Sequence, residues 1–314
     1  MKAVVCPKYG PPEVLHLTEM GRPVPKANEV LIRVRATTVH IGDTKIRALR
    51  PGMGPWLDLV VKAFMRIAVG FTGPRRKILG MELSGEIEET GRDVTAFKKG
   101  DLVFCGTEML FGAYAEYICL PQAMALVKKP ANMSHEEAAT VPNGGITALL
   151  MLRKAGVGKG QKVLIYGASG SVGTFAVQLA RNFGAEVTGV CSAANLEMVR
   201  SLGAEKVIDY TASDFRCNGE RYDVIFDAVG KLSRSSVKCS LTRTGRYFNV
   251  LTDSGTSMKL HVADLTFLKE QIEAGKLRTV IDRTYSLEEI VEAHRYVDLG
   301  HKKGNVAVTV GQGT

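Results

Sequence analysis

Residues 162–192 read KVLIYGASGSVGTFAVQLARNFGAEVTGVCS, and this stretch decides the fold. Its apolar run VLIY, at 163–166, is typical of a buried strand. A glycine turn follows, and apolar residues then recur at steps of three and one through residues 172–183, which predicts an amphipathic helix. Gly184 ends that helix, and residues 186–191 form a second apolar strand. Strand, glycine turn, helix and strand together make a βαβ unit.

The glycines of the turn, Gly167, Gly170 and Gly173, suit a phosphate-binding site. One glycine allows a sharp turn off the strand, one lacks the Cβ that would keep a pyrophosphate away from the main chain, and one allows close packing of helix and strand. The helix N-terminus adds N–H groups and a partial positive charge. The spacing is G-x-x-G-x-x-G, so the motif depends on its place between a strand and a helix. A turn that binds nothing is the alternative.

The composition is that of a soluble globular protein, with 314 residues, 45% of them hydrophobic, and a net charge of +9. Six scattered cysteines without a C-x-x-C pair favour a reducing, cytoplasmic compartment. Cys191 and Cys239 fall in segments that we expect to be core. Basic residues are spread along the chain, and the clusters at 75–77 and 302–303 are interpreted as solvated surface rather than as a DNA- or RNA-binding site.

Three segments differ in character. Residues 1–125 are rich in predicted strands and frequent turns, which indicates a partly open β-barrel. Residues 126–262 alternate between helical and strand patterns, as a doubly wound parallel sheet requires, and Ser134 with Glu137 forms a capping box at the first helix. Residues 263–314 contribute two further helices and a last strand. The sequence therefore predicts an α/β protein of two domains.

The stretch WLDLVVKAFMRIAVGF, at 56–71, departs from the β-rich pattern around it. Asp58, Lys62 and Arg66 repeat every four residues, so one face of the predicted helix is polar. The stretch is too short to span a bilayer. We expect its apolar face to pack locally, with contact to a partner or a membrane surface as the alternatives.

Signatures along nearly the whole chain now carry a family resemblance: MKAVV, GRDVTAFKKGDLVF, GAYAEY, GITAL, GASGSVG, SLGAEKVIDY and DVIFDAVG. Together they resemble zinc-free members of the medium-chain dehydrogenase/reductase superfamily, in the quinone oxidoreductase (zeta-crystallin-like) branch. The resemblance implies a GroES-like β-barrel, a Rossmann domain, and a C-terminal segment, 263–314, that completes the Rossmann domain and returns to the barrel. It also implies NADPH-dependent hydride transfer to a quinone or an activated alkene such as an enone or enal.

Zinc-dependent relatives carry a glycine-histidine-glutamate signature where this chain has Gly80, Met81 and Glu82, and a cysteine ligand near the position of His40. A methionine thioether does not replace an imidazole as a zinc ligand. No cysteine quartet is present for a structural zinc. We therefore expect a zinc-independent enzyme with no metal site.

NADP(H) is the expected cofactor. In NAD-binding folds the second strand commonly ends in an acidic residue that binds the ribose 2′-hydroxyl, but here Cys191 is followed by Ser192. Ser192 and Asn195 offer donors to a 2′-phosphate, although a plain helix N-cap is the alternative role of Ser192. The resemblance adds Tyr210 beside that phosphate and Thr147 at the nicotinamide, with a strand end and an ordinary helix position as their alternatives.

The strand after the βαβ unit ends at Asp227, where a Rossmann sheet contacts its ligand, or where the aspartate is only a turn former. The predicted cofactor-binding residues are Thr147, Gly167, Ala168, Ser169, Gly170, Ser171, Val172, Gly173, Cys191, Ser192, Asn195, Tyr210, Asp227, Ala228, Val229 and Gly230.

The resemblance places the segment ATTVHIGDTKIR against the substrate, with His40 where similar quinone reductases have asparagine and Asp43 kept as aspartate. His40 is expected to hydrogen-bond the substrate oxygen or to donate a proton after hydride transfer. Thr44 and Lys45 are further catalytic candidates. The alternatives are a satisfied polar residue for His40 and a loop-fixing role for Asp43, which we favour for the latter.

After Val250, similar proteins have a longer stretch that supplies a sixth strand, which often pairs across a dimer. Here only LTDSGTSMKLHVA precedes the next predicted helix, as in a trimmed domain or a sequence with a section omitted. The expected partners are a small-molecule substrate and a second copy in a homodimer. Two other functions stay open. One is an NADPH-binding protein of low turnover that acts through a partner, a membrane surface or RNA, and the other is an enoyl-thioester reductase.

Overall fold

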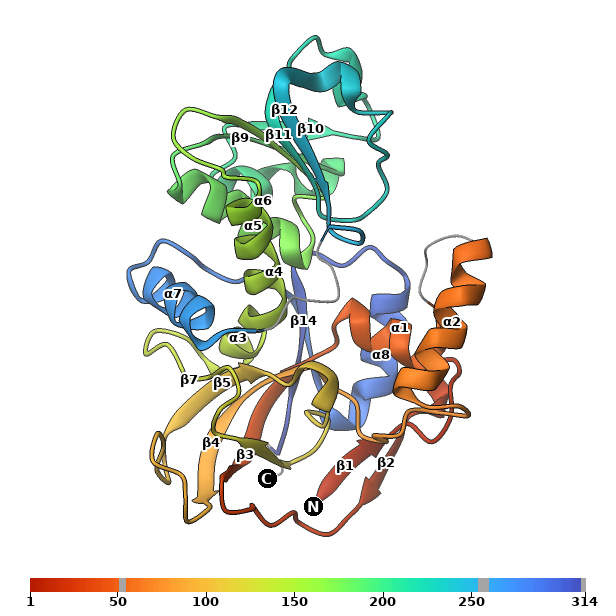
Figure 1. Ribbon diagram of the computed structural model, residues 1–314, viewed down its shortest axis with the longest axis vertical. Coiled ribbons are helices and arrows are strands. Elements are labelled where there is room, and N and C mark those ends of the chain that lie inside the picture. Colours follow the sequence, from red (N-terminus) through yellow and green to blue (C-terminus); the bar gives the residue numbers. More distant parts are fainter. Residues whose placement is uncertain (51–54, 254–259, 312–314) are drawn as a thin grey trace. The chain divides into compact units, whose positions relative to one another are not determined.

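The structure is a computed structural model that describes residues 1–50, 55–253 and 260–311, with the side chains of 55–57 left aside. Contacts divide the chain into two units (Figure 1). The first unit comprises residues 1–142, 260–265 and 281–314, and the second comprises residues 143–259 and 266–280. The boundary at Pro142 lies beyond residue 125, where the sequence composition begins to change.

The first unit is built on a seven-stranded sheet with the order β13-β14-β3-β4-β5-β7, in which β6 also pairs with β3, and on a separate pair formed by β1 and β2. Its strands are β1 (Lys2–Val5), β2 (His16–Glu19), β3 (Glu29–Thr38), β4 (Glu82–Thr90), β5 (Leu102–Gly106), β6 (Tyr117–Pro121), β7 (Leu126–Lys128), β13 (Ile281–Ser286) and β14 (Asn305–Thr309). Its helices are α1 (Ile41–Ala48), α2 (Pro55–Val69), α3 (His135–Ala139) and α8 (Ile290–Asp298).

The long strand β3 organises this unit because it pairs with β4, β6 and β14. Its side chains alternate toward a core that includes Val30, Ile32 and Val34, all essentially inaccessible to solvent. The antiparallel register sets Thr38 opposite Ala307, and the N–H of the next residue, Val39, donates to the Val306 carbonyl over 3.0 Å. This pairing fixes the position at which β3 ends and the chain turns toward α1.

The second unit is a five-stranded parallel sheet with the order β10-β9-β8-β11-β12, which corresponds to the order 3-2-1-4-5 of a Rossmann sheet. Its strands are β8 (Lys162–Tyr166), β9 (Glu186–Cys191), β10 (Lys206–Asp209), β11 (Tyr222–Asp227) and β12 (Leu241–Asn249). Its helices are α5 (Ser171–Asn182) and α6 (Leu196–Ser201). It also contains most of α4 (Val141–Lys154) and of α7 (Val262–Glu273), whose first residues belong to the first unit.

Local sequence signals explain the ends of several helices. Ser134 accepts a hydrogen bond from the Glu137 N–H, and the Glu137 carboxylate accepts one from the Ser134 N–H, so the predicted capping box at α3 is confirmed. Gly184 has φ = 85° directly after α5, a left-handed conformation that stops the helix at little cost in a glycine. No strand pairs with the outer edge of β12 among the described residues, so the sixth strand of similar proteins is not found there.

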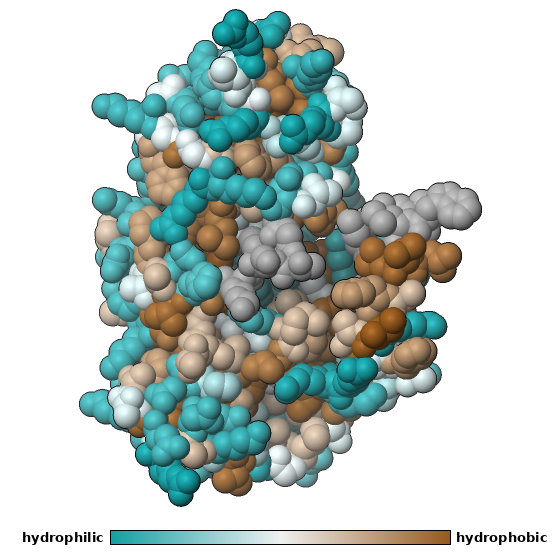
Figure 2. Space-filling model, viewed as in Figure 1, coloured by the Kyte–Doolittle hydropathy of each residue, from teal (hydrophilic) through white to brown (hydrophobic). Residues whose placement is uncertain are grey.

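The stretch 56–71 is helical as far as Val69, as its charge spacing predicts, but its orientation differs from the expectation. The apolar side chains Leu59, Val60, Phe64 and Ile67 are exposed, whereas Met65 packs on the core of the first unit. The expectation that the apolar face packs locally is therefore wrong. The hydrophobic side chains gather visibly over α2 in Figure 2.

Candidate active site

The glycine turn lies between β8 and α5, as the βαβ unit requires. Gly167 has φ = 79°, which lets the chain turn off β8. The N–H groups of Gly167 and Ala168 both donate to the Val190 carbonyl over 3.0 Å, so the turn is tied to the neighbouring strand β9. A Cβ on Gly167 would lie 2.2 Å from a methyl group of Val229, which shows that this turn and the loop after β11 are in contact.

The other two glycines have different surroundings. A Cβ on Gly173 would lie 2.1 Å from the Gly167 carbonyl oxygen, so only glycine allows α5 to pack this close to the turn. A Cβ on Gly170 would meet only that same carbonyl oxygen, at 3.5 Å. The space beside Gly170 is therefore available to a ligand, whereas the space beside Gly173 is already filled by the protein's own backbone.

The N-terminus of α5 completes the turn. Gly170 is its N-cap residue and no side chain caps the helix there, in keeping with a site for an external anion. The side chains of Ser169, Ser171 and Val172, at the start of the helix, are partly exposed, while that of Ala168 is buried. Gly144 of α4 approaches Ser171 so closely that a Cβ would lie 2.7 Å from its Oγ. Thr147 follows one turn later on α4 and is partly exposed.

The second strand, β9, ends in the predicted non-acidic turn. Asn195 donates from Nδ2 to the Oγ of Ser192 over 3.1 Å, and its own Oδ1 is buried without a hydrogen-bond partner. The Tyr210 N–H donates to the Cys191 carbonyl over 3.0 Å, which places Tyr210 at the same end of the sheet, with its side chain 52% exposed. The structure thus brings together Cys191, Ser192, Asn195 and Tyr210 as predicted. The carboxylate of Asp209, opposite Cys191 at the end of β10, lies beside them and accepts from the Thr211 N–H and hydroxyl.

Asp227 ends β11 and holds its own loop. One carboxylate oxygen accepts from the N–H groups of Val229 and Gly230 over 3.0 and 2.8 Å, and the other accepts from the Leu232 N–H over 2.7 Å. The Ala228 N–H donates to the Tyr166 carbonyl across the sheet. The carboxylate of Asp227 is buried and engaged in these bonds, so the turn-former interpretation describes this side chain, while Val229 and Gly230 remain at the ligand edge.

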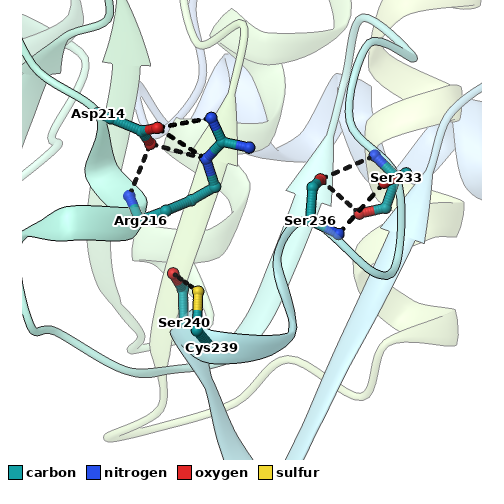
Figure 3. Close-up of polar contacts among 6 residues, drawn as sticks. All are labelled: Asp214, Arg216, Ser233, Ser236, Cys239 and Ser240. Carbon is teal, nitrogen blue, oxygen red and sulfur yellow. Dashed lines mark hydrogen bonds and ion pairs between the residues drawn. The ribbon is translucent and has the colours of Figure 1, made fainter.

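The loops that follow β10 and β11 carry their own polar contacts (Figure 3). The Arg216 guanidinium pairs with the Asp214 carboxylate through Nε at 2.8 and 2.9 Å and through Nη2 at 2.5 Å. Its charge is therefore paired within its own loop. Cys239 lies in a short 3-10 turn before β12, where its Sγ is 3.8 Å from the Oγ of Ser240. Cys239 is exposed, so its expected burial is wrong, whereas Cys191 is buried as expected.

His40 caps α1 in the first unit. Its Nδ1 accepts a hydrogen bond from the Gly42 N–H over 3.1 Å, and its own N–H donates to the Asp43 carboxylate over 3.1 Å. Burial, followed by the positive charges of Lys302 and Lys45, lowers the pKa of His40 to about 4. The imidazole is therefore neutral near pH 7, and because Nδ1 is an acceptor, the proton lies on Nε2.

The three neighbours predicted with His40 have different roles. Asp43 is fully buried, and its second oxygen accepts from the Gly80 N–H over 3.2 Å, in agreement with a loop-fixing role. Burial raises the pKa of Asp43 to about 7. The buried Thr44 hydroxyl donates to the Ile41 carbonyl over 3.2 Å, so this donor is used within the helix. Burial lowers the pKa of Lys45, which stays partly exposed.

Sequence reasoning missed Lys302 and Glu82. The register of β14 against β3 brings the loop before β14 next to His40, and in that loop the Lys302 ammonium donates to the Gly304 carbonyl over 2.5 Å. Burial, opposed by the negative charge of Glu82, lowers the pKa of Lys302 to about 8. Glu82 is buried and accepts from the Thr38 hydroxyl over 2.5 Å. The interpretation of 302–303 as solvated surface is therefore wrong for Lys302, whose amine is enclosed beside two polar side chains.

Met81 stands where zinc-dependent relatives have histidine. A Cβ on Gly42 would lie 2.9 Å from the Met81 sulfur and 3.1 Å from the His40 Nδ1, so both side chains surround this position. In the described part of the chain, no group of three or more His, Cys, Asp or Glu side chains is arranged to hold a metal ion.

A cavity of about 590 Å³ lies beside the C-terminal half of α1. Thr44 and Lys45 line it together with the cationic side chains of Arg47 and Arg50. Arg47 is buried and pairs with Asp298 over 2.5 Å, and its Nε and Nη1 have no hydrogen-bond partner. The cavity wall is thus positively charged on balance.

Comparison with known proteins assigns both units. Residues 26–131 match the alcohol dehydrogenase GroES-like domain family, and residues 171–286 match the zinc-binding dehydrogenase family. The chain is 32% identical over 359 residues to the mitochondrial NAD(P)H oxidoreductase RTN4IP1 of Mus musculus, covering 99% of this chain and 89% of the mouse protein. This chain belongs to the medium-chain dehydrogenase/reductase superfamily.

Other members of the superfamily are equally informative. The chain is 30% identical to the 2-methylene-furan-3-one reductase of Solanum lycopersicum, covering 98% of this chain and 79% of the tomato protein. The structure of the quinone oxidoreductase from Coxiella burnetii superposes with a TM-score of 0.81 at 28% identity, over 99% of both chains. The resemblance seen in the sequence is confirmed, as is the combination of a GroES-like domain with a Rossmann domain. The chain is an oxidoreductase related to enzymes that use a nicotinamide cofactor.

Proposed function

We propose that this protein is a zinc-independent, NADPH-dependent reductase that transfers hydride to a quinone or an activated alkene. The observation that carries the proposal is the turn at Gly170, where the backbone is open to a ligand, the N-terminus of α5 has no side-chain cap and β9 ends in Cys191 rather than in an acidic residue. Members of the superfamily with quinone and furanone reductase activity by name support the substrate class.

The residues around the turn fit a phosphorylated dinucleotide. The N–H groups at the start of α5 would hold the pyrophosphate. Ser192 and Asn195 would hold the 2′-phosphate, and the unpartnered Oδ1 of Asn195 leaves room for a ribose hydroxyl donor. Thr147 and the Val229–Gly230 backbone would contact the nicotinamide end. When bound, the cofactor supplies the hydride.

His40 would hold the substrate oxygen. Its neutral imidazole presents Nε2–H as a hydrogen-bond donor, while Nδ1 is fixed by the Gly42 N–H. A donor already oriented by the protein stabilises the negative charge that develops on a carbonyl oxygen when the conjugated system accepts a hydride. With a pKa of about 4, His40 acts as a hydrogen-bond donor rather than as the acid.

Lys302 would supply the proton. Hydride addition leaves the reduced substrate with one negative charge on oxygen, and transfer of one proton from the Lys302 ammonium neutralises it. Solvent then reprotonates the amine, so each turnover consumes one hydride and one proton. With a pKa of about 8 the amine is protonated at neutral pH. A general acid works best when its pKa lies near the operating pH, as this one does.

The same region supports the proposed zinc independence. The thioether of Met81 lies beside His40 where a ligand imidazole would be needed, and the ammonium of Lys302 lies close enough to lower the pKa of that histidine. A cation at this place opposes a second cation electrostatically. The hydrogen bond from His40 and the proton from Lys302 would then stabilise the charge on the substrate oxygen in place of a zinc ion.

The test is oxidation of NADPH and NADH, followed by absorbance, with panels of quinones, alkenals and enones. We expect turnover with NADPH and one of these substrate classes, unchanged after dialysis against a chelator. Loss of activity on chelation, restored by zinc, would refute zinc independence. NADPH binding without reduction of any substrate would instead favour the low-turnover binding protein.

A second candidate is an enoyl-thioester reductase, and the cationic cavity beside α1 favours it. Lys45 and Arg50 would bind the phosphate of a pantetheine-bearing substrate. Crotonyl-CoA should then be reduced with a lower KM than the N-acetylcysteamine thioester, which lacks phosphate, and Arg50→Gln should remove the difference. Equal KM values for the two thioesters would exclude this use of the cavity.

The compartment and the assembly remain proposals. All six cysteines are free, in keeping with the reducing, cytoplasmic location that we propose, whereas the name of the mouse relative places that protein in mitochondria. No helix among the described residues is long and apolar enough to cross a membrane. A homodimer is proposed by analogy, and size-exclusion chromatography with light scattering tests it.

A further inference from the structure

The helix α2 presents its apolar face to solvent. Leu59, Val60, Phe64 and Ile67 on the helix and Phe71 just after it are 62 to 71% exposed. At about 100° per residue, the four helical positions fall within an arc of about 140°. Four large apolar side chains on one helix face, with a fifth exposed just after the helix, are more than the isolated exposed hydrophobic residues that a soluble protein normally shows. This face is hereafter the α2 face (Figure 2).

The α2 face is held outward by contacts on the opposite side of the helix. Met65 packs on the core of the first unit, and Val69 is buried in it. The end of the helix is fastened by the Tyr9 hydroxyl, which donates to the Gly70 carbonyl over 2.7 Å, and by Arg75, which donates to the Ile67 carbonyl over 3.0 Å. These contacts fix the direction of the apolar side chains, so the exposure is a property of the packed helix.

The charge around the α2 face is positive on balance, with Asp58 as the acidic residue of the helix. Between Asp58 and Glu82 the chain contains no acidic residue and five basic ones, Lys62, Arg66, Arg75, Arg76 and Lys77. Arg66 lies on the helix edge that borders the apolar arc, and the run 75–77 is exposed directly after it. An apolar stripe bordered by cations matches the two layers of an anionic membrane surface, with acyl chains beneath and phosphate groups above.

We propose that the α2 face docks this protein on the surface of an anionic lipid bilayer. The apolar side chains enter the boundary between headgroups and acyl chains, and the basic residues pair with lipid phosphates. The helix has 15 residues and carries charges along its length, so it lies in the plane of the surface and does not span the bilayer. This inference does not depend on the reductase activity, but it would bring the enzyme to quinones dissolved in membranes.

Vesicle binding of the full chain tests the proposal directly. The chain's one tryptophan, Trp56, belongs to α2, so its emission reports on this helix. With vesicles of phosphatidylcholine and phosphatidylglycerol in equal parts, we expect a blue shift and co-sedimentation that weaken as salt is added. With vesicles of phosphatidylcholine alone, binding should be at least tenfold weaker.

Two double variants separate the apolar and the charged contributions. Phe64→Glu with Ile67→Glu should weaken binding to the mixed vesicles at least tenfold, and Arg66→Gln with Arg76→Gln should reduce the preference for anionic lipid. The matched control is Val24→Glu with Leu299→Glu, two exposed apolar residues outside α2 that are 82% and 67% exposed, and it should bind as the wild type does.

Several results would overturn the proposal. One is the absence of binding to the mixed vesicles, and another is an equal loss of binding in the control pair. A third is a dimer in light scattering that Phe64→Glu with Ile67→Glu dissociates, which would identify a second copy as the occupant. Turnover of a water-soluble substrate is measured in parallel. Because vesicle binding needs no turnover, failure of the reductase assay and failure of membrane docking are distinguished.

Discussion

The side-chain amide of Asn195 donates to the hydroxyl of Ser192 over 3.1 Å, at the end of the strand where NAD-binding folds commonly carry an acidic residue. This pair puts neutral side chains at the end of β9, while the nearest carboxylate, Asp209 at the end of β10, is bonded to Thr211. We expect Ser192→Asp to weaken NADPH binding at least tenfold, about 1.4 kcal/mol, because its carboxylate would repel the 2′-phosphate. Fluorescence titration measures both nucleotides. NADH affinity should be unchanged or higher, and an equal loss for both nucleotides would contradict the assignment.

The glycine turn makes a prediction that separates ligand contact from folding. Gly170→Ala should keep the wild-type melting temperature but weaken NADPH binding at least tenfold, since its methyl group meets only one carbonyl oxygen at 3.5 Å and would occupy the ligand's space. Gly173→Ala should lower the melting temperature, because its methyl group would lie 2.1 Å from the Gly167 oxygen. Thermal unfolding with nucleotide titration checks both. Normal NADPH affinity in Gly170→Ala would remove the pyrophosphate from this turn.

His40→Ala should lower kcat about 100-fold, which is the usual effect of removing one oriented donor to a developing oxyanion. Its affinity for NADPH should not change, because the proposed nucleotide contacts lie in the second unit. His16→Ala, at an exposed position on β2, is the matched control. Steady-state kinetics with the best substrate of the panel gives the result, and a variant with wild-type kcat would return His40 to the role of a helix cap.

Lys302 predicts the alkaline limb of the pH profile. Below pH 8 the amine is protonated and kcat/KM should be level, and above its pKa of about 8 the rate should fall tenfold per pH unit as the proton is lost. Lys302→Arg stays charged at high pH and should lose this limb together with most of the activity, because arginine does not release its proton. Lys303→Arg, at the exposed neighbour, should keep the wild-type profile. An unchanged limb in Lys302→Arg would assign the titration to another group.

His294 predicts a loss of stability in acid. Its imidazole is fully buried against the Tyr114 hydroxyl at 3.2 Å, and burial lowers its pKa from the ordinary 6.5 to about 3. Below pH 6.5 the unfolded chain therefore binds a proton that the folded chain does not, and the free energy of unfolding falls by about 1.4 kcal/mol per pH unit. Above pH 6.5 the contribution is constant.

The variant His294→Phe removes this dependence. Urea unfolding at pH 7 and at about pH 5 should show a smaller drop in stability for the variant than for the wild type. His40 contributes in the same direction and Asp43, whose pKa is raised to about 7, in the opposite one, and both are present in each protein. Equal slopes for the two proteins would show that His294 is protonated in the folded state.

The parts of the fold that could be predicted are those with a clear period. The glycine turn and its flanking strand and helix are found at β8 and α5, because apolar residues at helical spacing and an uninterrupted apolar strand leave few other conformations. By contrast, α1 and β13 were not predicted. The eight residues of α1 begin after His40, a residue type outside the favoured N-caps, and β13 carries a mixed polar sequence that only its pairing with β14 makes a strand.

The residues that lie together at the carboxyl ends of the parallel strands could be named from the sequence, but Lys302 beside His40 could not be singled out, for a physical reason. Ser192 and Tyr210 follow strands that the pattern already places side by side, so their proximity is a consequence of the sheet. Lys302 is separated by more than 260 positions from His40, and its burial depends on the register of β14 against β3. A lysine in a pair of basic residues is normally exposed, and no local sequence pattern indicates that the folded chain encloses its amine. The outward face of α2 was missed because periodicity finds two faces of a helix without telling which one meets the protein.

The strand β12 ends the sheet of the second unit with an edge that no described strand covers. Unpaired strand edges promote aggregation by adding strands from other molecules. Here the edge carries the exposed cations Arg243 and Arg246, and the register of β11 against β12 shifts between Tyr222 and Val224. Like charges and an irregular backbone both hinder stacking of copies edge to edge. With this edge the protein should stay in solution at low salt. High salt, which screens the arginines, should be the condition under which concentrated protein first precipitates.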